Sequence, residues 1–285
     1  METLEGLREG EMKLGEPMKN HTSLRIGGPA DIFALPRDLD SLRRIHTHLR
    51  TNHTPFLACG GGTNILVRDG GIDGAVICLG SLKKISPERQ EGEDIYLAVE
   101  AGVSLWKLVN LSGEHGFSGL EGLAGIPGTV GGAICGNAGS FGYEMKDVLV
   151  SVQLMDSGGG IRSVAAKEIG FGYRSSGILK EELLLSAELK LRKDDRENVA
   201  SRIENFLKIK REKQPIRERS AGCVFKNPPG LSAGRLIDEA GCKGPTSQTL
   251  ISLRHFLPGN SLVSHVKPRY FIHNITPTFR NFQYH

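Results

Sequence analysis

The chain has 285 residues, with 36 lysines and arginines against 32 acidic residues and a formal net charge of +4. Without a long Lys/Arg run it lacks the footprint of a nucleic-acid or membrane-surface binder, which favours a small anionic ligand. The opening segment has no basic-then-apolar leader and no run approaches the roughly 18 apolar residues of a membrane span, so we expect a cytoplasmic protein.

Taken in chain order, the sequence predicts three regions. Between Asn20 and Gly80, short apolar runs alternate with glycine turns around a helix at Leu39–Arg50, which indicates a small α/β unit. Strand candidates then dominate up to Arg192, around a helix at Leu105–Glu114 and a long glycine loop. A charged stretch ending at Pro215 is rich in helix formers and predicts a linker helix. The strand candidates are residues 30–35, 55–60, 64–67, 74–80, 95–103, 148–156 and 182–192.

The first glycine loop follows a predicted strand and reads CGGGTNILV, Cys59 to Val67. Glycines can adopt positive φ and let backbone N–H groups converge on an anion such as a diphosphate. The loop lacks the GK[ST] ending of an ATP-binding P-loop and is not the GxGxxG of a dinucleotide-binding Rossmann fold. On its own the loop is better explained as a tight connection between strands.

The second glycine loop, Gly119 to Gly142, holds nine glycines together with Pro127 and Asn137. Glycine weakens regular elements and is most useful where a ligand or another backbone must approach closely, so this segment predicts a ligand-binding surface. The two loops together could hold a long ligand with a diphosphate in its middle.

Two further segments carry reactive side chains. Tyr173 and Arg174 stand in FGYRSS, and Cys223 stands in SAGCVFKNPPG with Lys226 and Asn227 just after it. From the sequence pattern alone, Arg174 also fits a surface salt bridge, and Cys223 also fits a small buried hydrophobic residue. The five cysteines are scattered without a CxxC pair, so we expect reduced thiols and no zinc site.

Five blocks resemble, in order and spacing, the UDP-N-acetylenolpyruvoylglucosamine reductases (the MurB family). They are NHTSLRIGGPADIFALP, CGGGTNILVRDGG, GLAGIPGTVGGAICGNAGSFGYEMKDVLVSV, FGYRSS and SAGCVFKNPPGLSAGRLIDEAGCKG, and they cover residues 20–244. The uninterrupted run from Gly142 to Val152 resembles the form of the family without an extra substrate-capping loop.

The resemblance implies an α+β fold. Residues 1–80 and 81–193 would be two lobes of an FAD-binding domain of the vanillyl-alcohol-oxidase (PCMH) type, and residues 194–285 an α/β substrate domain. It also implies NADPH-dependent reduction of UDP-N-acetylglucosamine enolpyruvate to UDP-N-acetylmuramate for peptidoglycan and cell-wall synthesis, with a UDP-sugar as the small-molecule partner. Substrate contacts would come from Tyr173, Lys226 and Asn227. The residues matching the FAD site are Gly60, Gly61, Gly62, Thr63, Asn64, Ile65, Gly125, Ile126, Pro127, Gly128, Thr129, Gly131, Gly132, Asn137, Ala138 and Gly139.

The catalytic residues implied by the resemblance are Arg174 and Cys223. Hydride transfer from the flavin to the vinyl C3 would leave carbanion character on C2, delocalised into the carboxylate, and this charge needs a fixed cation. Arg174 matches that position, and its guanidinium can bridge a carboxylate with two donors. Many members protonate C2 with a serine hydroxyl, whereas Cys223 occupies the matching position here. A thiol releases a proton more readily than an alcohol, so the replacement is chemically competent.

The C-terminal segment departs from the family pattern. After Glu239 there is no Asp or Glu, although the family has a glutamate near its C-terminus that helps to orient the substrate. Residues 263–278 resemble the family's VSxxHANYFIN stretch, but residues 245–285 are otherwise atypical, so we expect an incomplete C-terminal domain. A genuine basic extension, a reading-frame change and a truncation all remain open.

The alternative function is a catalytically impaired remnant that still binds FAD or a UDP-sugar. The C-terminal histidines have irregular spacings and no accompanying acidic side chain or cysteine, so we expect no metal site there.

Overall fold

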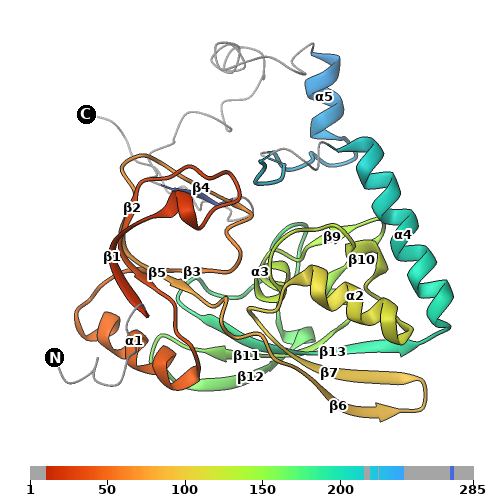
Figure 1. The fold of residues 1–285 in the computed structure, drawn as a ribbon, viewed down its shortest axis with the longest axis horizontal. Helices are drawn as coiled ribbons and strands as arrows, with labels where there is room; N and C mark the ends of the chain where they lie inside the picture. Colours follow the sequence, from red (N-terminus) through yellow and green to blue (C-terminus); the bar gives the residue numbers. More distant parts are fainter. Residues whose placement is uncertain (1–10, 215–218, 224, 241–269, 273–285) are drawn as a thin grey trace.

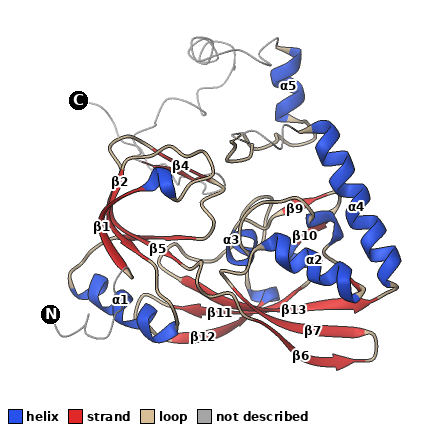
Figure 2. Cartoon of the chain, viewed as in Figure 1, coloured by secondary structure: helices blue, strands red, loops and turns tan. Residues whose placement is uncertain are grey.

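The computed structural model describes residues 11–214, 219–223, 225–240 and 270–272, and Figures 1 and 2 show how they are arranged. Two sheets dominate. A smaller sheet has the strand order β1-β2-β5-β3, and a larger one has the order β12-β11-β13-β7-β6 with the short strand β8 beside β13.

The smaller sheet is formed by β1 (Met12–Pro17), β2 (Pro29–Ala34), β3 (Phe56–Cys59) and β5 (Ile72–Cys78). Strand β2 is antiparallel to β1 but parallel to β5, and β5 is parallel to β3. Both faces of the sheet are covered by apolar side chains, as strands of parallel character require. Helix α1 (Leu39–Thr51) covers one face, and its first turn is closed by a capping box in which the Asp38 side chain accepts from the Ser41 N–H.

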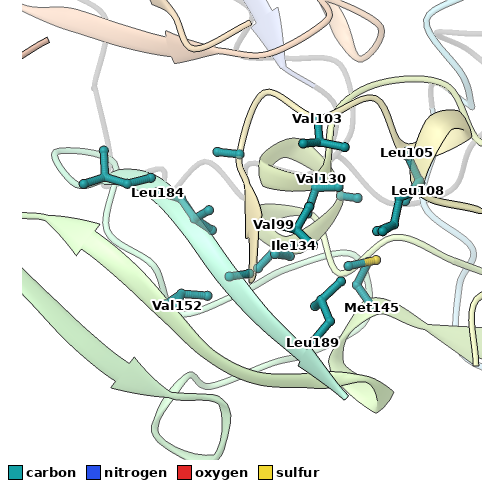
Figure 3. Close-up of a cluster of buried hydrophobic side chains, with 14 of the residues drawn as sticks. Val99, Val103, Leu105, Leu108, Val130, Ile134, Met145, Val152, Leu184 and Leu189 are labelled. Atoms are coloured by element: carbon teal, nitrogen blue, oxygen red, sulfur yellow. The ribbon is translucent and has the colours of Figure 1, made fainter. Parts of the chain in front are cut away.

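The larger sheet is antiparallel throughout. Its strands are β6 (Ile85–Glu91), β7 (Asp94–Glu100), β8 (Phe117–Ser118), β11 (Leu149–Met155), β12 (Ile161–Ala165) and β13 (Leu183–Lys193). Two helices, α2 (Leu105–His115) and α3 (Val130–Cys135), lie over the sheet. Figure 3 shows Val99, Val152 and Leu189 of the strands in one cluster of buried hydrophobic side chains with residues of both helices, such as Leu108 and Ile134.

One hydrophobic cluster runs from α1 through the larger sheet to α4 (Arg196–Lys213). Helix α4 follows β13 and packs against α2, β8 and the 3-10 turn η3 (Glu121–Leu123). The helix α5 (Ala233–Glu239) comes later in the chain, and β14 (Tyr270–Ile272) pairs antiparallel with β4 (Ile65–Val67). The remaining short elements are η2 (Met18–Asn20), β9 (Gly139–Ser140), β10 (Tyr143–Glu144), η4 (Met145–Asp147) and η5 (Ala166–Glu168).

The three predicted helices before residue 215 and the seven predicted strands are confirmed, with ends shifted by a few residues. Strands β1, β6 and β12 are not among the predicted elements. The two sheets fall on either side of residue 80, but the shared cluster crosses that point, so the division at residues 80 and 193 stays a prediction. Among the described residues, no helix is both long and apolar enough to span a bilayer.

Candidate functional site

The two glycine loops lie against each other. A β-carbon placed on Gly60 would meet Thr129 Oγ1 at 2.2 Å, and one on Gly61 would meet the Gly128 Cα at 3.4 Å. A hydrogen bond of 3.3 Å from Thr63 Oγ1 to the Pro127 carbonyl joins the loops as well. The two loops that the sequence assigns to one ligand therefore lie in contact, while the ligand itself stays a prediction.

The first loop is fixed from the N-terminal side of the chain. Gly62 has φ +60°, and a β-carbon there would lie 1.8 Å from the His21 carbonyl oxygen, so only glycine fits. The Gly62 carbonyl accepts a 3.1 Å hydrogen bond from the Ser23 N–H. The first loop is thus pinned between the 21–23 segment and the second loop.

The second loop is held by the segment that leads into α2. The Leu105 N–H donates to the Gly128 carbonyl at 3.0 Å, and the Gly131 N–H donates to the Ala101 carbonyl at 2.9 Å. Thr129 is the N-cap of helix α3, and its hydroxyl accepts from the Gly132 N–H at 3.4 Å. A β-carbon on Gly131 would meet that of Ala101 at 2.8 Å, so packing explains this glycine.

Packing does not explain Gly61 and Gly132. Both are exposed, neither has a positive φ, and an added β-carbon would make only ordinary contacts. Glycine in a helix costs about 1 kcal/mol relative to alanine, so Gly132 weakens α3 without a benefit inside the protein. Open backbone on both loops is what a long diphosphate-bearing ligand requires, so the residues present fit FAD.

Other residues predicted to bind FAD are buried or packed against the core. Ile65 is buried at the start of β4, and Ile126 and Ala138 pack partly against the main core. Asn137 is 1% exposed, and its side chain forms hydrogen bonds with Glu144, Gly172 and Lys146 inside the protein. The side chain of Asn137 is therefore engaged within the protein, and its place in the FAD site stays a prediction.

The Arg174 side chain binds the second glycine loop. Its Nη2 donates to the Gly139 carbonyl at 2.7 Å, and its backbone has φ +52°, a left-handed conformation that costs about 1 kcal/mol or more for a side chain of this size. Within the described residues this carbonyl is the one hydrogen-bond acceptor of the guanidinium, whose five N–H donors leave others for a ligand. Among the described residues Arg174 forms no ion pair with an acidic side chain, so the alternative of a surface salt bridge is not observed.

The Cys223 segment approaches the same region. The Ser220 carbonyl accepts a 2.6 Å bond from Ser23 Oγ, and Lys226 Nζ donates to the Arg174 carbonyl at 3.4 Å. Cys223 itself is exposed, which excludes the alternative of a buried hydrophobic residue. No contact between Cys223 and Arg174 is present among the described atoms.

Tyr173 and Asn227 line one cavity of about 670 Å³. Arg235, which the sequence reasoning missed, faces it too, and forms a 2.6 Å ion pair with Glu239. Two residues predicted to touch substrate are therefore brought together, with a cation beside them.

Helix α4 supplies residues that the sequence reasoning also missed. Lys210 is 6% exposed and donates through Nζ to the Ala124 carbonyl, next to Gly125. Burial, together with the charge of Arg174, lowers the pKa of Lys210 to about 8. Farther up the helix, Arg202 pairs at 2.8 Å with Glu121, whose side chain is fully buried. Their position in a charged helix gave no signal of these contacts.

Several predictions fall outside the described residues. The atypical residues 245–285, apart from β14, and the C-terminal histidines lie there. The predictions of an incomplete C-terminal domain and of a missing family glutamate concern this same segment. In the part of the chain that the structure describes, no three His, Cys, Asp or Glu side chains are grouped to hold a metal.

Comparison with known proteins links this geometry to one family. The FAD binding domain model matches residues 30–165, and the C-terminal domain model of UDP-N-acetylenolpyruvoylglucosamine reductase matches residues 214–256. The reductase of that name from Caldanaerobacter subterraneus subsp. tengcongensis is 42% identical over 239 residues, 84% of this chain and 78% of the relative. That of Syntrophus aciditrophicus is 38% identical over 92% of this chain and 84% of its own length.

Among solved structures, UDP-N-acetylenolpyruvylglucosamine reductase (MurB) from Thermus caldophilus superposes with a TM-score of 0.69. It is 36% identical, and the match covers 82% of this chain and 81% of that one. The predicted fold class, an α+β FAD-binding fold followed by a reductase C-terminal domain, is confirmed.

Proposed function

Because the chain belongs to the UDP-N-acetylenolpyruvoylglucosamine reductase family, we propose that it reduces UDP-N-acetylglucosamine enolpyruvate to UDP-N-acetylmuramate with FAD and NADPH. The observation that carries the proposal is the meeting of the two glycine loops, with Arg174 bound to the second of them at Gly139. A cofactor surface and a fixed cation thus adjoin each other.

The exposed backbone of the two loops would hold FAD, chiefly through Gly60–Asn64 and the 125–139 segment. When bound, FAD supplies the hydride that it has received from NADPH. The loops are joined to each other and to the 21–23 segment by hydrogen bonds between protein atoms, which would hold the surface in place for FAD. Preformed sites lose less free energy to ordering on binding.

Arg174 would bind the substrate carboxylate. Its bond to Gly139 fixes one edge of the guanidinium, and the other donors can bridge the two carboxylate oxygens. Negative charge spreads onto these oxygens during reduction, so a cation fixed beforehand stabilises the transition state more than the ground state. Tyr173, Asn227 and Lys226 would contact the sugar-nucleotide nearby.

Cys223 would protonate C2 of the substrate. Its thiol is exposed on a segment tied to Ser23 and to the Arg174 backbone, so a substrate held by Arg174 is within reach of that segment. We place the reaction in the cytoplasm, where the soluble UDP-sugar would serve peptidoglycan synthesis and through it cell shape and division. The further division into lobes at residue 80 and a substrate domain from residue 194 is part of the same proposal.

A direct test is to purify the protein, record its flavin absorption spectrum and follow NADPH oxidation with and without the enolpyruvyl substrate. We expect a yellow protein whose NADPH oxidation depends on the substrate, and a product that has gained two hydrogens by mass spectrometry. A yellow protein without this activity would contradict the reductase function but leave FAD binding intact. A colourless protein that cannot be reconstituted with FAD would contradict both.

A further inference from the structure

The Asn137 side chain is fully occupied inside the protein. Its Nδ2 donates to Glu144 Oε2 at 3.0 Å and to the Gly172 carbonyl at 3.2 Å, and its Oδ1 accepts from the Lys146 N–H at 3.2 Å. The orientation of the amide follows from chemistry, because a carboxylate and a carbonyl can only accept and a backbone N–H can only donate. Both Nδ2–H donors are therefore used, and with 1% of the residue exposed the second lone pair of Oδ1 is not accessible to a cofactor.

The Gly172 carbonyl belongs to the turn that carries the reactive arginine. Gly172 and Ser175 exchange backbone hydrogen bonds of 3.1 and 3.3 Å, so that Tyr173 and Arg174 stand at the tip of a closed turn. Asn137 binds this turn from the glycine loop, and Arg174 binds back to the same loop at Gly139. Two bonds in opposite directions thus join the 137–139 segment to the 172–175 turn.

Both ends of this connection have strained backbones. Asn137 has φ +40° and Arg174 has φ +52°. Such conformations persist where surrounding contacts over-determine them, and they gather at functional sites. The Asn137 side chain joins the two strained segments directly, because it stands on one of them and bonds to Gly172, two residues before Arg174, on the other.

Glu144 orients the asparagine. It pairs with Lys146 Nζ at 2.6 Å, and the bonds from Lys146 and then Asn137, aided by the charge of Arg174, hold its pKa below the usual value. The carboxylate is therefore ionised at neutral pH, and a charged acceptor makes a stronger hydrogen bond than a neutral one. The backbone of Glu144 also pairs with Gly139, which places the acid on the strand beside the arginine's acceptor.

We propose that Asn137, held by Glu144, is a positioning residue for Arg174, fixing the 172–175 turn so that the guanidinium presents its remaining donors to the substrate carboxylate. The inference rests on the proposed function for the identity of that carboxylate. It assigns the Asn137 side chain to the arginine turn rather than to FAD.

The test uses Asn137→Gly, because glycine tolerates φ +40° and the change removes the side-chain bonds without adding strain. His53→Gly is the matched control, since His53 also has a positive φ, of +50°, but is exposed just after α1, outside the 137–146 and 172–175 segments. We expect Asn137→Gly to keep its bound FAD and its rate of flavin reduction by NADPH. Turnover of the enolpyruvyl substrate should fall on the order of 10²-fold, the usual cost of a small misplacement.

A double-mutant cycle with Arg174→Lys separates positioning from other roles. If Asn137 acts through Arg174, Asn137→Gly should cost much less in the Arg174→Lys background than in the wild type. Multiplicative losses, or loss of FAD from Asn137→Gly, would overturn the proposal. Glu144→Gln should also lower turnover, but by less than Asn137→Gly, because the glutamine amide oxygen can still accept from Asn137.

Amide hydrogen exchange tests the positioning without turnover. Exchange at the Ser175 N–H should accelerate in Asn137→Gly and stay unchanged in His53→Gly. An unchanged Ser175 rate in Asn137→Gly would refute the positioning role even if the wild type is an active reductase. An inactive wild type with the expected exchange pattern would refute the proposed function and leave the positioning of the turn standing.

Discussion

Thr129 Oγ1 occupies the place next to Gly60 that a β-carbon would need, 2.2 Å from where that atom would lie. The same hydroxyl accepts from the Gly132 N–H at the start of α3. One side chain therefore closes the two glycine loops against each other and caps the helix beside them. The absence of a side chain at Gly60 is a condition for both contacts.

Gly60→Ala should disturb this junction. Because the new methyl group would displace Thr129, we expect the free energy of unfolding of the FAD-free protein to fall by about 1–3 kcal/mol, with weaker FAD binding in addition. Denaturant titration and FAD titration measure the two effects. Gly70→Ala is the control, since an added β-carbon there has nothing within 4 Å. Equal behaviour of the two variants would refute the role of the junction.

Gly132→Ala should separate folding from binding. Its β-carbon meets only Thr129 Oγ1, at 3.6 Å, so the protein has room for it, and alanine favours the helix by up to about 1 kcal/mol. We expect the FAD-free protein to be as stable as the wild type or more so, while FAD affinity falls because the methyl group takes ligand space. Unchanged FAD affinity would place the cofactor elsewhere.

Cys223→Ser should retain measurable turnover, and Cys223→Ala should lose orders of magnitude, because only the serine preserves a proton donor for C2. The rate of substrate reduction under saturating NADPH is the measurement, with flavin reduction by NADPH as the step that neither change should affect. A full rate in the alanine variant would remove Cys223 from the mechanism.

Lys210 should give stability a pH dependence. Its pKa is lowered, mainly by burial, from 10.5 to about 8, so the folded state binds the proton less well than the unfolded chain. The penalty is complete below about pH 8 and is relieved as the pH rises towards 10.5, so stability rises through this window. The difference in unfolding free energy between wild type and Lys210→Met should change across it, whereas Lys208→Met, an exposed lysine on the same helix, should follow the wild type. Parallel profiles of wild type and Lys210→Met would contradict this prediction.

The interior strands and the helices could be predicted because the spacing of their apolar residues follows the face that each element buries. Strands β7, β11 and β13 read as apolar runs, whereas the edge strands β1, β6 and β12 carry polar and charged residues such as those of ISPERQE in β6. Edge strands are commonly charged, which guards against pairing with other chains, and the same charges hide them from a pattern of hydrophobicity.

The candidate site was predictable where it is made of backbone and less so where it is made of side-chain partnerships. Clustered glycines indicate that a ligand or another backbone comes close to the chain, whichever of the two it is. The two loops could therefore be found from the sequence. The inward turn of Asn137 and the burial of Lys210 depend on partners distant in the chain, at Gly172 and Ala124. Lys210 stands in the run KIKREK, which is typical of a solvated helix face, and nothing local distinguishes it.

The attachment of α4 to the glycine loop limits how this protein can be divided. Arg202 pairs with the buried Glu121, and Lys210 binds the Ala124 carbonyl, so the helix that opens the C-terminal region also holds the second glycine loop in place. A version ending at residue 193 would lose the Arg202–Glu121 ion pair and would uncover the apolar surface of α2 and η3 that α4 packs against. An independently folding flavin module, if one is to be cut from this chain or exchanged between relatives, has to carry α4 with it.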